Sequence, residues 1–372
     1  MRSTGYYQNI GQTSYFIPLP LPPSSPDFIM SVTLTELYGK AMLELGQLNE
    51  IARNIPNIFR FIKAYVIKEA LLSSAIEDIH TTLLEVFTQP LSDELHDKST
   101  QLVINYTHAL DAALHLMLKD NLPISTRLIL QAHSNLMEGQ GSYAQPGSYR
   151  NQSVKVGNLV PPPAQSITQL MSELEEFINN DPTIPSLIKA GLAHVQFETI
   201  HPFIDGNGRI GRLLIVLMLI DYKILDLPIL YPSYYFKKHR SDYYHALDRV
   251  RTHGDFEGWV QFYLQAIIAS TQDAYIRARD IKNLEQELEQ KILNNIINTR
   301  TQELMLRTLS LLFESPVTTI SQLAKKIDKS YNTTAKIIDL FCQHTILIEH
   351  SSVRRNKIYR FDQYLELLEK EY

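Results

Sequence analysis

Apolar residues recur every three or four positions along most of the chain, which predicts a protein built mainly from helices. The pattern is first clear at Leu34, Leu37, Tyr38 and Met42. Further helices are expected at about residues 58–73, 100–118, 124–138, 166–179, 186–199, 209–222, 241–250 and 255–290. Strand signals are weak: residues 150–156 alternate between two glycines and predict one short hairpin. The fold class is therefore expected to be mostly α with a small β-hairpin.

The two ends of the chain differ from this helical middle. Five prolines fall within residues 18–26, a composition that favours extended or polyproline structure. We interpret residues 1–33 as an N-terminal arm, which is either poorly ordered or packed along the domain through Tyr15, Phe16 and Ile17. The main helical domain is then expected over residues 34–290.

A second domain is expected over residues 291–372, joined through a polar helix at 282–298. Three helices are predicted at 302–313, 319–327 and 330–344, with Thr318 or Thr319 and then Ser330 as N-caps. Two strands are predicted at 345–349 and 356–361. This order of elements predicts a domain like a winged helix-turn-helix.

Composition excludes several classes of protein. With 44% apolar residues among 372, the chain can bury an ordinary core and is not wholly disordered. The longest apolar run, residues 213–220, is too short to span a membrane. Cys342 is the only cysteine, and residues 1–10 lack the apolar stretch of a secretory signal. We therefore expect a cytoplasmic protein without a membrane partner, and the net charge of −5 gives no general attraction to nucleic acid.

The stretch HPFIDGNGRIGR at residues 201–212 carries the clearest chemistry. It lies between two expected helices, and Pro202 ends the first of them. Gly206 and Gly208 allow positive φ and a close backbone approach. The free N–H groups at the start of the next helix favour an anion, and Arg209 and Arg212, three residues apart, suit phosphates.

Two further side chains complete this loop. His201 can accept a proton from an attacking hydroxyl near neutral pH. Asp205 supplies a hard oxygen ligand for Mg²⁺, which takes one or two carboxylates besides phosphate oxygens and water. The parts together suit attack on a nucleotide phosphate. The embedded G-x-G-x-x-G pattern is not taken as a dinucleotide fingerprint, because a helix rather than a strand is expected before it.

Residues 201–212 match the Fic signature HPFx[D/E]GNGRxxR at every specified position, and the chain resembles the Fic family over roughly residues 35–290. Fic proteins are mostly helical enzymes that transfer AMP from ATP to protein hydroxyls. The resemblance implies that His201 activates a Ser, Thr or Tyr hydroxyl and that Asp205 binds Mg²⁺. It implies a nucleotide-binding turn in which Gly206, Asn207 and Gly208 cradle the α- and β-phosphates, Arg209 and Arg212 hold the β- and γ-phosphates, and Ile210 and Gly211 complete the turn.

The resemblance assigns two more segments around the nucleotide. Residues 149–163 resemble the Fic flap, whose exposed edge pairs with a strand of the target protein. Its nucleotide-contacting part corresponds to Val156, Gly157, Asn158 and Leu159, although a plain surface hairpin is the alternative. The segment containing Tyr243 and Tyr244 resembles the one near the adenine, but core packing explains at least one of these rings equally well.

Residues 72–78, LSSAIED, resemble the Fic inhibitory helix pattern [S/T]xxxE[G/N], within a helix expected at about residues 60–78. Ser73 and Glu77 lie four apart and share a helix face. The resemblance implies that Glu77 makes a bidentate contact with Arg212 and competes with the γ-phosphate of ATP. Asp78 departs from the family pattern, and a solvated surface glutamate is the alternative.

The resulting hypothesis is an autoinhibited protein adenylyltransferase that uses Mg²⁺ and ATP and acts on protein hydroxyls, including its own. The resemblance also implies a reverse hydrolytic activity. A homodimer is an expectation from the family alone. The alternatives are transfer of UMP, phosphocholine or phosphate, a toxin–antitoxin component, and a DNA-binding regulator whose Fic domain senses nucleotide. DNA contact rests on eight Lys and Arg residues against three acids between residues 325 and 360.

Overall fold

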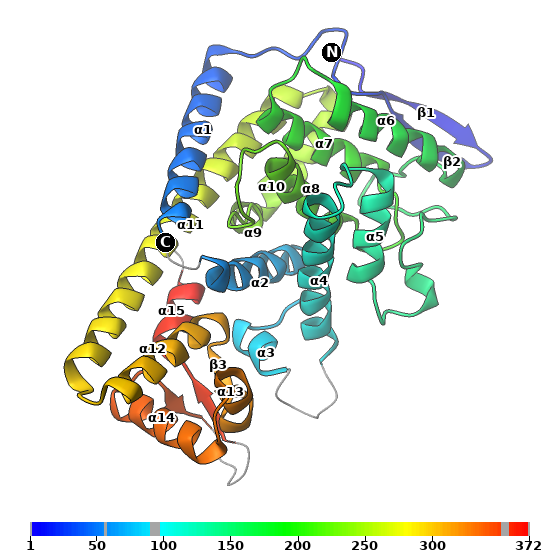
Figure 1. The fold of residues 1–372 in the computed structure, drawn as a ribbon. Helices are drawn as coiled ribbons and strands as arrows, with labels where there is room; N and C mark the ends of the chain where they lie inside the picture. Colours follow the sequence, from blue (N-terminus) through cyan, green and yellow to red (C-terminus); the bar gives the residue numbers. More distant parts are fainter. Residues whose placement is uncertain (1, 56–57, 90–96, 351–356, 371–372) are drawn as a thin grey trace.

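The computed structural model describes residues 2–55, 58–89, 97–350 and 357–370, and it is mostly helical (Figure 1). The long helices form where the three-to-four-residue pattern predicts them: α1 (Val32–Arg53), α2 (Phe59–Ile76), α4 (Lys98–Leu118), α5 (Thr126–Leu136), α6 (Ile167–Asn180), α7 (Ser186–Ile200), α8 (Asn207–Asp221), α10 (Arg240–His253) and α11 (Phe256–Asn295). The pattern did not predict the short helices α3 (Leu83–Thr88) and α9 (Ser233–Lys238), nor the 3₁₀ turns Ser142–Ala144 and Ala164–Ser166. In the part of the chain that is described, no helix is both long and apolar enough to cross a bilayer.

Helices α7 and α8 form the centre of the fold. They pack against each other, and α7 also borders α6, α10 and α11 while α8 borders α2, α4 and α5. Both helices are therefore buried around nearly their whole circumference, which explains the continuous apolar run at residues 213–220. The loop at residues 201–206 therefore connects two buried helices.

The N-terminal arm is a β-hairpin packed on this helical core. Strands β1 (Gly5–Ile10) and β2 (Thr13–Pro18) pair antiparallel around Gly11, whose φ is +60°. Tyr15, Phe16 and Ile17 are buried, as the packed form of the arm predicts, and the pairing of the two extended strands was not predicted. The prolines begin only at the end of β2, so they do not interrupt the pairing.

The C-terminal residues form a small mixed unit at the far end of α11. Its elements are α12 (Thr299–Glu314), β3 (Val317–Thr319), α13 (Ile320–Ile327), α14 (Tyr331–Gln343), β4 (Ile348–Glu349), β5 (Ile358–Arg360) and α15 (Asp362–Glu369). The strands form an antiparallel sheet in the order β3-β5-β4. Thr319 and Ser330 accept the N-cap hydrogen bonds of α13 and α14. This order of elements supports the winged-helix assignment, which stays a prediction.

This unit also packs against α2, because Phe61 of α2 contacts the rings of Phe313 and Tyr364. Lys68, about two turns further along α2, donates to the carbonyl of Leu368 in α15 at 2.8 Å. Strand β3 and helix α15 were not expected from the sequence, and Arg354 and Arg355 of the predicted basic surface lie outside the described residues. The C-terminal unit is therefore in contact with the helix that carries Ser73.

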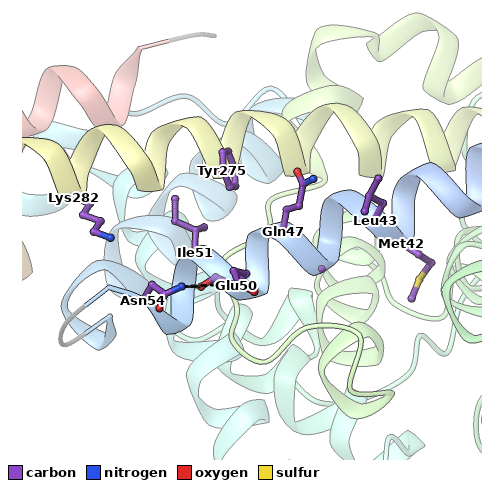
Figure 2. Close-up of a pocket in the computed structure, with 9 residues that line it drawn as sticks. Met42, Leu43, Gln47, Glu50, Ile51, Asn54, Tyr275 and Lys282 are labelled. Atoms are coloured by element: carbon purple, nitrogen blue, oxygen red, sulfur yellow. Dashed lines mark hydrogen bonds between the residues drawn. The ribbon is translucent and has the colours of Figure 1, made fainter.

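A surface groove runs along the contact between α1 and α11, which pack side by side (Figure 2). Both helices contribute apolar and polar side chains to it: Met42, Leu43, Gly46, Gln47, Glu50, Ile51, Asn54, Tyr275 and Lys282. No residue of the 201–212 loop lines this groove. The chemistry that the sequence predicts is therefore located elsewhere, in the centre of the fold.

Candidate active site

The loop between α7 and α8 is fixed by its own backbone conformation. Helix α7 ends at Ile200, and His201 takes a left-handed conformation with a φ of +49°. Gly206, with a φ of +81°, precedes the first residue of α8. Asn207 closes the loop between these points, because its side-chain oxygen accepts from the Phe203 amide at 2.8 Å and its nitrogen donates to the Phe203 carbonyl at 2.9 Å. The side chain of Asn207 is thus engaged within the loop, which leaves its backbone N–H to face an anion.

His133 of α5 supports the same loop, although sequence analysis did not identify it. Its ring stacks on Phe203 with the centroids 3.7 Å apart. The Gly147 amide donates to Nδ1 at 3.1 Å, so Nε2 carries the hydrogen and donates to the carbonyl of Asp205, also at 3.1 Å. Burial lowers the pKa of His133 to about 4, which keeps this neutral form at neutral pH. His133 therefore orients the turn that carries Asp205.

His201 is largely enclosed in the loop and neutral at physiological pH. Burial, followed by the nearby charge of Arg150, lowers its pKa to about 4. Its Nδ1 is buried and has no hydrogen-bond partner among the described residues. A neutral imidazole can accept a proton, as a general base must.

The first turn of α8 presents donors to an anion. A helix start leaves its first backbone N–H groups unpaired, and both arginines of the motif are buried beside them. Nε and Nη1 of Arg209 and Nη1 of Arg212 have no hydrogen-bond partner within the described part of the chain. Buried unpaired donors at a helix N-terminus fit a group rich in negatively charged oxygens, such as a phosphate chain.

Asp205 offers a carboxylate at the rim of the same turn. Its side chain is mostly exposed, and Oδ1 accepts from the Gly206 amide at 2.5 Å and from Nη2 of Arg209 at 3.3 Å. The described residues hold no group of three or more His, Cys, Asp or Glu side chains suited to a metal. A single exposed carboxylate beside a phosphate site fits Mg²⁺, which binds phosphate oxygens and water as its other ligands.

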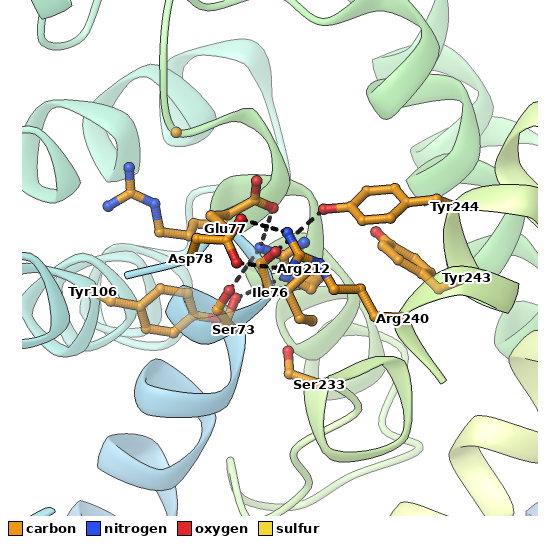
Figure 3. A network of polar contacts seen from close by, with 12 residues as sticks. Ser73, Ile76, Glu77, Asp78, Tyr106, Arg212, Ser233, Arg240, Tyr243 and Tyr244 are labelled. Carbon is orange, nitrogen blue, oxygen red and sulfur yellow. Dashed lines mark hydrogen bonds and ion pairs between the residues drawn. The ribbon is translucent and has the colours of Figure 1, made fainter. Parts of the chain in front are cut away.

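Glu77 and Ser73 meet Arg212 from the end of α2 (Figure 3). Nε of Arg212 donates to the Ser73 hydroxyl at 2.8 Å, and Nη2 donates to the Ser73 carbonyl and to Oε1 of Glu77, both at 2.9 Å. The expected bidentate contact is not formed, because Ser73 occupies the Nε edge of the guanidinium. A Cβ atom at Gly208 would overlap Oε1 of Glu77, so only glycine lets this carboxylate approach the start of α8.

Asp78 follows Glu77 in a left-handed conformation, with a φ of +59°. That conformation explains why glycine or asparagine suits this position. Its carboxylate pairs with both terminal nitrogens of Arg240, at 2.7 and 2.8 Å (Figure 3). The Asp78 side chain thus connects the end of α2 to the start of α10.

The two tyrosines of the predicted adenine segment occupy different environments. Tyr243 is only 1% exposed, and its hydroxyl contacts Nε2 of His194 at 2.8 Å within a cluster that includes Phe236 and Trp259. Tyr244 is 41% exposed and lies under the guanidinium of Arg240. Core packing therefore accounts for Tyr243, and Tyr244 alone presents a ring to solvent.

The flap segment is less regular than expected. No strand forms over residues 150–156; a single antiparallel bridge joins Val156 to Leu159 across Gly157 and Asn158. The C-terminal side continues into Pro161, Pro162 and Pro163, which have no N–H group to donate. Val160 instead accepts from the Phe16 amide of β2 at 2.9 Å. The expectation of a hairpin over 150–156 was therefore wrong, and the N-terminal hairpin supports the flap.

Two buried acids near Arg212 also escaped sequence analysis. Burial raises the pKa of Glu198 to about 8 and that of Glu69 to about 7. The Glu69 carboxylate accepts hydrogen bonds from the hydroxyls of Ser233 and Tyr106. Both of these residues lie below Arg212 in Figure 3. The sequence does mark Glu198, because it is the single acidic residue in the second half of α7 and lies three residues before His201.

Comparisons with known proteins match the part of the chain that carries this site. The Fic/DOC family profile matches residues 123–219, and the Fic/DOC N-terminal profile matches residues 35–115. The protein adenylyltransferase Fic of Drosophila erecta is 33% identical over 169 residues, which cover 44% of this chain. The match spans 32% of that relative, about a third of its length.

Two solved structures have the same fold. A Fic family protein from Desulfovibrio desulfuricans G20 matches with a TM-score of 0.59 and 21% identity, over 90% of this chain and 97% of the other. Fic-1 of C. elegans, residues 134–508, matches with a TM-score of 0.51 and 22% identity, over 67% of this chain and 74% of the other. The complete signature in the loop between α7 and α8 lies within residues 123–219, so the part of the chain that carries the site matches the Fic/DOC family.

Proposed function

We propose that this protein transfers AMP from ATP to a hydroxyl group of a protein, and that Glu77 restrains this reaction. The observation that carries the proposal is the neutral His201 beside a helix start with buried, unpaired arginine donors. The complete signature and the similarity to adenylyltransferases of Drosophila support it.

The chemistry follows from what each group can do. The backbone N–H groups of the first turn of α8 and the free donors of Arg209 and Arg212 would hold the phosphate chain. Asp205 would hold Mg²⁺, which when bound offsets charge on the phosphates. The target oxygen forms a bond to the α-phosphorus, the bond from that phosphorus to the β-phosphate oxygen breaks, and pyrophosphate leaves. His201 accepts the hydroxyl proton, and Nε2 is the nitrogen left for it because Nδ1 is enclosed.

The restraint follows from the position of the Glu77 carboxylate. It is bonded to Nη2 of Arg212 and lies against the backbone of Gly208, where an anion at the helix start would otherwise be bound. A carboxylate and a phosphate cannot both accept the same hydrogen bond from Nη2 of Arg212, and their like charges repel each other. ATP would then bind without Arg212 on its terminal phosphate, with the α-phosphorus poorly aligned.

The direct test uses ATP labelled in either of two positions. Incubation of Glu77→Gly protein with Mg²⁺ and ATP labelled at the α-phosphate should label protein, whereas ATP labelled at the γ-phosphate should not. Label from the γ-phosphate would identify a kinase instead. Equal transfer from UTP labelled at its α-phosphate would contradict an adenine-specific site.

The finer assignments stay predictions with separate tests. Modification of the chain by itself, the reverse hydrolysis, the homodimer and DNA binding rest on the family resemblance or on local charge. For DNA binding, Lys325, Lys329 and Lys336 are exposed, while Lys357 and Arg360 are paired with acids. A gel shift that survives in His201→Ala protein, which should not transfer AMP, would identify a regulator that binds DNA independently of catalysis.

A further inference from the structure

Arg150 is a buried arginine that bonds only to backbone carbonyls among the described residues. It lies between α5 and α6, and its side chain is almost inaccessible, with the residue 2% exposed. Nε donates to the carbonyl of His201 at 2.8 Å and Nη1 to that of Gln152 at 3.0 Å, while Nη2 donates to the carbonyls of Pro162 at 2.6 Å and Ile200 at 3.4 Å. The ion pairs within the described ranges include none to Arg150. Burial of a guanidinium without a carboxylate is costly, so its carbonyl contacts need a reason.

These carbonyls belong to three separate pieces of the site. Gln152 and Pro162 lie on the two sides of the flap, before and after its single bridge. His201 lies in the motif loop, and the backbone N–H of Arg150 itself donates to Pro202 of that loop at 2.9 Å. One side chain thus connects both sides of the flap to the loop that carries the imidazole.

The flap and His201 both need such support. The proline-rich side of the flap has no N–H groups for strand pairing, so a ladder of backbone hydrogen bonds cannot hold it. His201 has a positive φ, which costs about 1–3 kcal/mol at a residue other than glycine and persists only where its surroundings hold it. A hydrogen bond from Arg150 to the His201 carbonyl fixes that peptide.

We propose that Arg150 is a positioning residue, which holds the flap and His201 at a fixed separation so that a target strand paired with the flap presents its hydroxyl to the imidazole. This rests on the proposed function. Only the planar fork of arginine reaches four carbonyls in these three pieces at once. Lysine keeps the charge but places its donors on a single ammonium group. It should therefore hydrogen-bond to one of these three pieces and lose the contacts with the other two.

The first experiment measures the flap without any reaction. Hydrogen exchange of the flap amides, over residues 151–160, is compared in Arg150→Lys, Arg150→Met and wild-type protein. Arg277→Met is the matched control, because Arg277 is also fully buried and donates to the backbone carbonyls of Leu367 and Lys370. We expect at least tenfold faster flap exchange in both Arg150 variants and no change at the flap in the Arg277 variant. Unchanged flap exchange in the Arg150 variants would overturn the proposal.

The second experiment separates positioning from ATP binding. The Arg150 and Arg277 substitutions are placed in Glu77→Gly protein, with the His201→Ala chain added as protein acceptor. Misplacement of about 1 Å costs on the order of 100-fold in rate, so Arg150→Lys should lose about 10- to 100-fold in transfer, with KM for the acceptor raised and Kd for ATP within about twofold. A loss no greater than that of Arg277→Met, or a matching loss of ATP affinity, would contradict the proposal. If Glu77→Gly protein transfers nothing at all, the proposed function fails, while the exchange measurement still decides whether Arg150 holds the flap.

Discussion

Oε1 of Glu77 lies 2.9 Å from Nη2 of Arg212, which links the end of α2 to the first turns of α8. The guanidinium is fully buried, whereas the carboxylate is about one third exposed. The arginine is held in place by Ser73 in any case, so the glutamate is the movable partner. Removal of the carboxylate should therefore open the phosphate site without loss of the arginine.

Glu77→Gly should raise AMP incorporation by about 10- to 100-fold at equal protein and Mg²⁺·ATP concentrations. A hydrogen bond to a charged group contributes about 1.5–3 kcal/mol, and 1.4 kcal/mol corresponds to a factor of ten. Incorporation of α-labelled ATP measures the effect. Glu77→Gln, which keeps the size but not the charge, should give an intermediate increase. Activity equal to wild type in both variants would remove Glu77 as an inhibitor.

His201→Ala in the Glu77→Gly background should abolish incorporation, with a loss of about 100- to 10,000-fold for a general base. ATP affinity should stay within about twofold, because the phosphate donors belong to α8. Incorporation and equilibrium ATP binding are the two measurements. His115→Ala serves as the control, since His115 is an exposed residue of α4 away from the loop. Retained incorporation in His201→Ala protein would show that another group takes the proton.

The sequence was sufficient for features that depend on neighbouring residues. Helices α5 and α6 follow from apolar periodicity, and the caps at Thr319 and Ser330 follow from residue type and position. The loop at 201–212 was predicted for a similar reason, because its conformation is set by its own proline, glycines and Asn207.

Features that depend on distant residues could not be found this way. The contacts of Arg150 with His201 join positions 51 apart, and no periodic pattern marks them. Tyr243 and Tyr244 are adjacent in an identical local pattern, and only the packing of α10 on α11 assigns one to the core. The β1–β2 hairpin has a local signal, Gly11 between two stretches rich in strand-forming residues, and the prolines begin only where the pairing ends.

Asp78→Asn should weaken inhibition slightly, because asparagine tolerates the left-handed backbone but loses the ion pair with Arg240. The pair is exposed, so the expected increase in AMP incorporation is only about two- to threefold at low salt. Arg240→Gln should have a similar effect, and the double variant should add little to either one. All of these differences should shrink in 1 M NaCl, where exposed charges are screened.

An increase that persists unchanged in 1 M NaCl would contradict the ion-pair explanation. It would indicate instead that Asp78 acts through the backbone at the end of α2. Asp78→Gly distinguishes the two, since glycine keeps the left-handed conformation and removes every side-chain contact.

The buried carboxyl of Glu198 should make stability depend on pH. Burial raises its pKa from 4.5 to about 8, so the folded protein keeps a proton that the unfolded chain releases. Its contribution to stability is complete below pH 4.5 and is lost as the pH rises towards 8, by at most about 1.4 kcal/mol per pH unit. Glu198→Gln removes this pH-dependent contribution to the free energy of unfolding. The difference in free energy of unfolding, wild type minus variant, should therefore fall between pH 5 and pH 8, as measured by denaturant unfolding at several pH values.

This difference isolates Glu198 from the buried histidines, whose lowered pKa values act in the opposite direction. His201 and His133 favour the folded state above pH 6.5, and that contribution is lost as the pH falls towards 4. It is common to both proteins and cancels in the subtraction. Glu36→Gln, at an exposed position of α1, should follow wild type across the whole range. A difference that stays constant between pH 5 and pH 8 would mean that Glu198 is ionised in the folded protein, and Arg212 would then have a second carboxylate partner beside Glu77.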